Sequence, residues 1–233
     1  MRVVTTCNKA GLAQYGHRWL DSRKHWPAGT EFRFYTEGFE VDCPGKDFRD
    51  MPEFAEWKLK NSRYRPPSWR FNVVGYAHKV FAACDALEGY SGIGVWLDAD
   101  CVTYEDIPAG LLESKVAGAY LAHYARPGLY TETGLWIMDC SHPGHRDFLD
   151  KWRAWYLSGR FRKLGMWTDC NTLDITIKQT GVPTVDLSAG VKSVHPMAVT
   201  ELGQYIDHCK GARKELGYSP ENKHRRQHDS ALR

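Results

Sequence analysis

An apolar run at residues 93–97, IGVWL, leads directly into the acidic sequence Asp98-Ala99-Asp100. Val95, Trp96 and Leu97 indicate a buried β-strand. In an extended chain residues i and i+2 lie on one face, so the two carboxylates converge on one spot at the end of the strand. Two like charges this close need a cation, a proton or solvent to separate them.

Strand and helix patterns alternate along the rest of the chain. Strands are predicted at 2–7, 30–38, 91–103, 115–124, 133–140 and 182–188. Helices are predicted from the end of the first strand to about 24, near 52–60, and at 73–87, 145–159 and 169–181. This alternation predicts one α/β domain with a largely parallel central sheet flanked by helices. The polar, basic segment 220–233 is expected to be a mobile tail.

Composition excludes several classes of protein. With 233 residues, 42% of them hydrophobic and 25% charged, the chain is ordinary for a globular protein and unlike a disordered one. A formal net charge of +3 is too small to demand a nucleic-acid partner. No apolar stretch has membrane-spanning length and the N-terminus carries no signal-peptide core. We therefore expect a cytoplasmic protein, in a bacterium or in a host cell if a phage encodes it.

The acid pair is a candidate metal site. Ligands of open α/β sheets gather beyond the carboxyl ends of strands, where Asp98 and Asp100 are predicted to lie. Carboxylate oxygens suit magnesium or manganese, which also bind substrate phosphates. On position alone, a turn acid beside a surface acid explains the pair equally well.

A second motif lies near the C-terminus, where His208, Gly211 and Lys214 have the spacing HxxGxxK. A histidine can complete the coordination of a metal, a glycine lets the backbone approach a phosphate, and a lysine neutralises diphosphate charge. A solvated helix end with a stray histidine is the alternative. Together with the acid pair, the motif favours a site for a metal and a diphosphate.

On these two motifs the chain resembles GT-A-fold glycosyltransferases, and most closely glycosyltransferase family 8 and its short relatives in bacteria and phages. The resemblance implies that Asp98, Asp100 and His208 hold Mn²⁺ or Mg²⁺ on a UDP-sugar, with Gly211 and Lys214 facing the diphosphate. It covers residues 1–215 and leaves 216–233 as a polar basic tail. Glu215-Leu216 follow the motif where the family has Pro-Trp.

The resemblance also implies residues near the donor sugar. In the family an Asn-x-Gly turn contacts the sugar. Here Glu132 replaces the asparagine and Thr133 and Gly134 follow it, which leaves the donor sugar open. An acidic residue at a helix N-terminus corresponds to Asp169. Gly134 is equally explained as a turn glycine, and Asp169, preceded by Thr168, as part of a helix cap.

Further candidates face the nucleotide. Thr5, Thr6 and Asn8, at the end of the first strand, are expected to contact uracil or ribose, although such residues also form ordinary turns. Basic residues precede the acidic strand in related enzymes, and Arg70 and Lys79 are the candidates here. Lys79 is equally explained as a solvated helix charge.

The predicted activity is metal-dependent transfer of a sugar from a UDP-sugar to a hydroxyl of a glycan or small molecule, with retention of configuration. An inverting reaction would use Asp169 or Glu132 as the base. A nucleotidyltransferase would ordinarily have a glycine-rich phosphate loop near its N-terminus, and the N-terminal segment here is a poor one. A glycoside hydrolase would need two carboxylates that flank the scissile bond, whereas the acid pair here stands at positions i and i+2. A non-catalytic nucleotide-sugar-binding protein is an alternative of another class.

A second alternative concerns the acceptor, which could be a hydroxylated base in phage-type DNA. Basic runs at 23–25, 58–65, 160–163 and 223–226 could grip a nucleic-acid backbone. The aromatic residues Trp57, Tyr64, Trp69 and Phe161 could stack bases. A base in a duplex would have to be flipped out to meet the sugar. Such runs are more often solvated faces, and the small net charge favours that interpretation.

Overall fold

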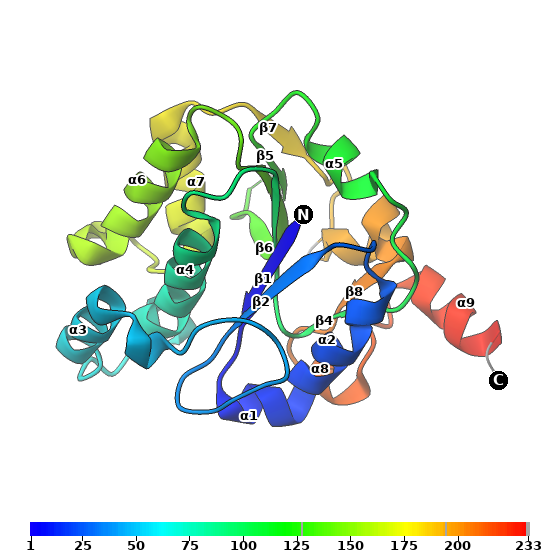
Figure 1. The fold of residues 1–233 in the computed structure, drawn as a ribbon, viewed down its shortest axis with the longest axis horizontal. Coiled ribbons are helices and arrows are strands. Elements are labelled where there is room, and N and C mark those ends of the chain that lie inside the picture. Colours follow the sequence, from blue (N-terminus) through cyan, green and yellow to red (C-terminus); the bar gives the residue numbers. More distant parts are fainter. Residues whose placement is uncertain (127, 194, 232–233) are drawn as a thin grey trace.

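In the computed structural model, residues 1–126, 128–193 and 195–231 are described (Figure 1). The main sheet has six strands in the order β2-β1-β3-β6-β5-β7. They are β1 (Arg2–Thr6), β2 (Glu31–Tyr35), β3 (Ile93–Leu97), β5 (Leu121–Tyr124), β6 (Glu132–Asp139) and β7 (Thr184–Asp186). The pairs β1–β2, β1–β3 and β5–β7 are parallel, and β6 is antiparallel to both of its neighbours. The predicted mostly parallel sheet is confirmed.

Two hydrophobic cores cover the two faces of the sheet, because alternate strand residues point to opposite sides. Val4 and Trp96 join the core beneath α3 (Pro52–Asn61), α4 (Val73–Leu87), α6 (His145–Leu157) and α7 (Asp169–Thr180), on the left in Figure 1. Val3 and Val95 join the core on the other face. That core is covered by α5 (Leu111–Val116) and by the helical segment α1 (Lys9–Gly11), η1 (Leu12–Gly16), α2 (His17–Asp21) and η2 (Ser22–His25).

Local capping explains where the helices begin and end. The side chain of Asn72 accepts a hydrogen bond from the Gly75 N–H and begins α4, and Thr168 likewise caps α7 through the Asn171 N–H. Helix α7 ends at Gly181, whose φ of +65° suits glycine. These helices match their predicted ranges. Short 3₁₀ turns connect other elements: η3 (Phe48–Asp50), η4 (Trp69–Phe71), η5 (Arg160–Lys163), η6 (Pro196–Val199) and η7 (Glu201–Gln204).

The predicted strand at 91–103 is two strands. β3 ends at Leu97, the chain turns through 98–100, and β4 (Cys101–Thr103) leaves the main sheet. The Cys101 N–H donates to the Asp98 carbonyl at 2.8 Å, which closes the turn. β4 pairs antiparallel with β8 (Ile206–His208), a strand that the sequence analysis did not predict.

Two other segments differ from expectation. The strand predicted at 115–124 begins only at Leu121, because residues 115 and 116 belong to α5 and Gly118 turns the chain with a φ of +78°. The segment expected to be a mobile tail contains α9 (Lys223–Ala231), preceded by α8 (Arg213–Leu216). The Arg225 guanidinium of α9 lies over the Tyr104 ring, 4.6 Å from its centroid, in a cation–π contact. Among the described residues, no helix has both the length and the apolar character needed to cross a membrane.

Candidate metal centre and adjoining cavity

The strand pairing of the small sheet brings Asp98, Asp100 and His208 together. β3 delivers Asp98, whose N–H donates to the Gly134 carbonyl of β6 at 2.8 Å. The β4–β8 register sets Cys101 opposite His208, and the Cys209 N–H donates to the Asp100 carbonyl at 2.9 Å. The two sequence motifs, far apart in the chain, therefore meet through backbone hydrogen bonds.

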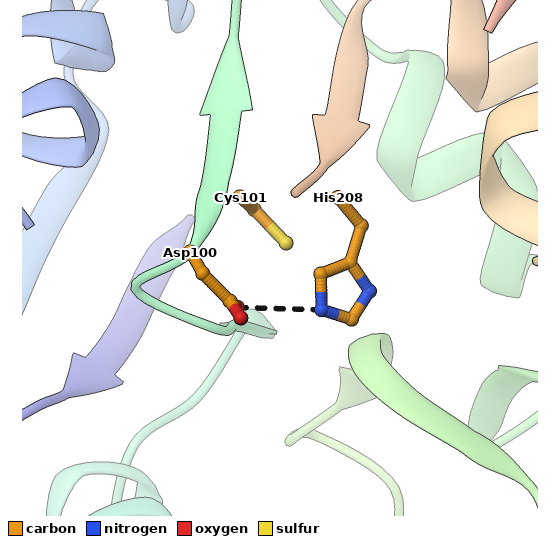
Figure 2. Close-up of side chains that lie close together, drawn as sticks. All are labelled: Asp100, Cys101 and His208. Atoms are coloured by element: carbon orange, nitrogen blue, oxygen red, sulfur yellow. Dashed lines mark ion pairs between the residues drawn. The ribbon is translucent and has the colours of Figure 1, made fainter. Parts of the chain in front are cut away.

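Figure 2 shows that the side chains of Asp100, Cys101 and His208 point toward one another. His208 Nε2 lies 3.3 Å from Asp100 Oδ1 and 3.9 Å from Asp98 Oδ2. Lys214 Nζ lies 3.1 Å from Asp100 Oδ2. The Cys101 thiol also lies beside Asp100 and His208. Burial raises the pKa of Cys101, so this thiol stays protonated and is a poor ligand for a hard cation.

Opposite charges hold this buried cluster together. Burial would raise the pKa of Asp100, but the His208 imidazole and the Lys214 ammonium lower it below its ordinary range. Burial would lower the pKa of His208, but the carboxylates of Asp100, Glu132 and Asp98 raise it. Two carboxylates and one imidazole around a shared positive charge form a donor set that suits Mn²⁺ or Mg²⁺.

Glu132 supports His208 from the side opposite the acid pair. Glu132 Oε1 lies 3.5 Å from His208 Nδ1, and the Glu132 carboxylate is paired with Lys210 and, at 3.2 Å, with Arg126. Burial opposes ionisation, but His208, Lys210 and Arg126 lower the pKa of Glu132 to about 2. A carboxylate with so low a pKa is a poor general base near neutral pH. It is well placed to orient the imidazole.

A second buried cluster surrounds Lys79 on α4. Its ammonium lies 2.7 Å from Asp98 Oδ1 and 3.1 Å from Asp169 Oδ2. The Thr133 hydroxyl donates to Asp169 Oδ2 at 2.7 Å, and Trp96 Nε1 donates to Asp98 Oδ1 at 2.7 Å. Lys79 is therefore a buried bridge between two carboxylates and not a solvated helix charge. Asp98 Oδ1 is occupied by these donors, and Asp98 Oδ2 faces His208.

These residues line one cavity of about 840 Å³. Ten of the candidate site residues named from the sequence line it: Thr6, Lys79, Asp98, Asp100, Glu132, Thr133, Asp169, His208, Gly211 and Lys214. Gly134 lies directly beneath the His208 imidazole.

The structure sets three candidates apart from the cavity lining. Thr5 is fully buried in β1. The Asn8 side chain accepts a hydrogen bond from the Gly11 N–H at 2.7 Å and caps α1. Arg70 is exposed, and its carbonyl accepts from the Trp167 N–H.

Several cavity residues were missed by the sequence analysis: Tyr15, Tyr76, Arg126, Tyr130, Lys210 and Arg213. Lys210 and Arg213 lie within the HxxGxxK segment, so their proximity could have been inferred. The aromatic residues have no common spacing, and only the packing of η1, α4 and the chain after β5 brings them to one cavity.

The similarity of this chain to known proteins lies in its fold. No family model and no curated protein sequence matches it. Among solved structures, it is similar to the galactosyltransferase LgtC in complex with donor and acceptor sugar analogs, with 11% identity over 91% of this chain and 88% of that one and a TM-score of 0.56.

Two further glycosyltransferase structures show the same likeness. A glycosyltransferase involved in glycosylation of the major capsid of PBCV-1 is 10% identical over 93% of this chain and 97% of that one, with a TM-score of 0.54. Mouse xyloside xylosyltransferase 1 is 11% identical over 80% and 84%, with a TM-score of 0.51. At such low identity the likeness concerns the fold alone. The chain therefore has a glycosyltransferase-like α/β fold, of the GT-A type expected from the sequence.

Proposed function

We propose that this chain is a metal-dependent glycosyltransferase that moves a sugar from a nucleotide-sugar donor, a UDP-sugar, to a hydroxyl group of a glycan or small molecule. The observation that carries the proposal is the convergence of Asp98, Asp100, His208 and Lys214 at the wall of one cavity. The glycosyltransferase-like fold supports it, because ligands of such sheets bind beyond the ends of the strands.

Asp98, Asp100 and His208 would hold Mn²⁺ or Mg²⁺, which supplies positive charge to the donor diphosphate. The Lys214 ammonium lies over the Tyr15 ring at 4.6 Å and beside Asp100. In this proposal it stabilises the negative charge that grows on the leaving UDP. Gly211 has a left-handed backbone with φ of +64° and open space beside it, so its N–H can approach a phosphate.

Asp169, Lys79 and Thr133 form the wall beside the donor sugar. The bond from the anomeric carbon to the diphosphate oxygen breaks, the acceptor oxygen bonds to that carbon, and the hydroxyl proton leaves with UDP. We assign retention of configuration from the family resemblance, and such a reaction needs no strong protein base. Glu132, whose pKa is lowered to about 2, acts in this proposal as a positioning residue for His208.

A DNA acceptor has less support, because several cations of the basic runs are already engaged. Lys58 pairs with Glu37 and Lys60 pairs with Glu56. Arg162 donates to the Asn61 side chain at 2.5 Å. Cations engaged within the protein contribute less to counterion release from a nucleic acid.

The test is UDP release from a panel of UDP-sugars, measured with and without Mn²⁺. We expect release that requires the metal and is abolished in Asp100→Ala. Asp106→Ala is the matched control, because Asp106 is exposed, pairs with His25 and lies outside the cavity lining. Failure of wild-type protein to release UDP from any donor, or equal release by Asp100→Ala, would contradict the proposal. Specific UDP-sugar binding without turnover would indicate a binding protein.

A further inference from the structure

The cavity has an aromatic end whose chemistry differs from that of the metal cluster. Trp69, Tyr76 and Tyr130 line it. The Trp69 residue is 53% exposed, and its ring meets the Tyr130 ring edge-on with centroids 6.3 Å apart and planes at 66°. The Arg70 guanidinium lies 5.6 Å from the Trp69 ring centroid, and the half-exposed indole keeps surface that a ligand in the cavity can contact.

This aromatic end adjoins the proposed position of the donor sugar. Tyr76 precedes Lys79 by three residues on α4, so the two side chains share one face of the helix. Tyr76 and Asp169 line the same cavity. Asp169 in turn contacts Lys79 and Thr133. Asp169, Tyr76 and Trp69 therefore line one cavity.

We infer that this aromatic end is the acceptor subsite and that it binds a neutral saccharide, with a pyranose ring stacked on Trp69. The inference rests on the proposed function, because an acceptor is needed only if a sugar is transferred. A pyranose presents a face of C–H groups that packs against the electron-rich face of an indole ring. Its hydroxyl groups would lie toward Asp169, where the transferred sugar is expected.

The charges around the aromatic end favour a neutral ligand. The Arg126 guanidinium lies 4.9 Å from the Tyr130 ring centroid and is paired with Glu132 at 3.2 Å. The carboxylates of Glu132 and Asp169 line the same cavity and are paired with Arg126, Lys210 and Lys79, so the charges of this wall are largely balanced within the protein. Carboxylates do accept hydrogen bonds from sugar hydroxyls. Stacking on an indole combined with carboxylate acceptors is suited to a saccharide better than to a nucleic-acid strand.

The test measures binding of neutral methyl pyranosides, namely methyl β-D-galactoside, methyl β-D-glucoside and methyl β-D-xyloside, to protein loaded with UDP and Mn²⁺, by ligand-observed NMR titration. We expect at least one to bind and Trp69→Ala to weaken that binding by about tenfold or more, in line with the ~1–3 kcal/mol that aromatic stacking contributes per base in nucleic-acid complexes. Trp69→Phe, which keeps an aromatic face, should recover most of the affinity.

Tyr64→Ala is the matched control, because Tyr64 is an exposed aromatic on the same connection that packs on Trp167 at 4.9 Å and does not line the cavity. It should bind the pyranosides as wild type does; an equal loss in Tyr64→Ala would overturn the inference. So would the absence of pyranoside binding, or binding that is indifferent to Trp69→Ala. Trp69-dependent binding of a hydroxymethylcytosine oligonucleotide in place of the pyranosides would assign the subsite to DNA. Wild-type UDP release without acceptor tests the proposed function separately.

Discussion

The imidazole of His208 occupies the space in which a side chain on residue 134 would lie. A β-carbon on Gly134 would be 2.3 Å from His208 Cε1 and 2.4 Å from His208 Nδ1. Since Gly134 belongs to β6 and has no left-handed backbone, its glycine is explained by this close approach and not by a turn.

Gly134→Ala should therefore displace the His208 ring, because the ring is buried and confined by Asp100 and Glu132. We expect Mn²⁺ affinity to fall by about 10–100-fold, the range seen when the support of a metal ligand is disturbed. Isothermal titration calorimetry measures this. Gly165→Ala is the control, because a β-carbon there meets no atom within 4 Å. Unchanged Mn²⁺ affinity in folded Gly134→Ala would show that His208 is not a ligand.

Glu132→Gln distinguishes a positioning residue from a base. The substitution keeps the shape of the side chain but removes the negative charge beside His208 Nδ1, Lys210 and Arg126. We expect Mn²⁺ affinity to fall by about tenfold or more, with UDP release restored in part at high Mn²⁺. Glu201→Gln, which breaks an exposed pair with Lys115, should leave both unchanged. Normal Mn²⁺ affinity together with lost turnover would instead assign Glu132 as the base.

Lys79→Met should destabilise the fold as well as the site. It leaves the carboxylates of Asp98 and Asp169 without their shared cation, and Asp169 is 3% exposed. Removing one partner of a buried ion pair costs about 3–5 kcal/mol of unfolding free energy. Urea denaturation measures the loss, and Lys115→Met, on the surface, is the control. Adding Asp169→Asn to Lys79→Met should recover part of the stability; no recovery would argue against the bridge.

Glu37 should make the stability of the protein depend on pH below neutrality. A hydrogen bond from His78, at 3.2 Å, and the pairing with Lys58 lower the pKa of Glu37 from 4.5 to about 2. A lowered pKa adds stability that is present above 4.5 and lost as the pH falls toward 2. Because the Glu37 side chain is 33% exposed, solvent screening reduces this contribution to about 1–2 kcal/mol.

At neutral pH the unfolding free energy of wild type should therefore exceed that of Glu37→Gln by about 1–2 kcal/mol. The difference should become smaller as the pH falls from 4.5 toward 2. Urea titrations at several pH values measure it. Glu56→Gln is the control, since the Glu56–Lys60 pair is exposed and should matter little. A difference between wild type and Glu37→Gln that stays constant with pH would refute the assignment.

The sequence alone determined the α/β class, most of the elements and the central cluster. Long amphipathic patterns such as the one at 73–87 depend on local periodicity, which a single chain displays directly. Asp98 and Asp100 could be identified because strand geometry places residues i and i+2 on one face. His208, Gly211 and Lys214 could be identified because their spacing matches a known motif.

Only the tertiary structure decided how those residues are arranged. β8 is three residues long and has no pattern of its own; it exists because β4 leaves the sheet after the turn at 98–100 and offers it hydrogen bonds. The burial of Lys79 between Asp98 and Asp169, and the contact of Glu132 with His208, depend on side chains from separate elements. The spacing of residues along the sequence does not indicate such long-range contacts, because they form only when the separate elements pack together.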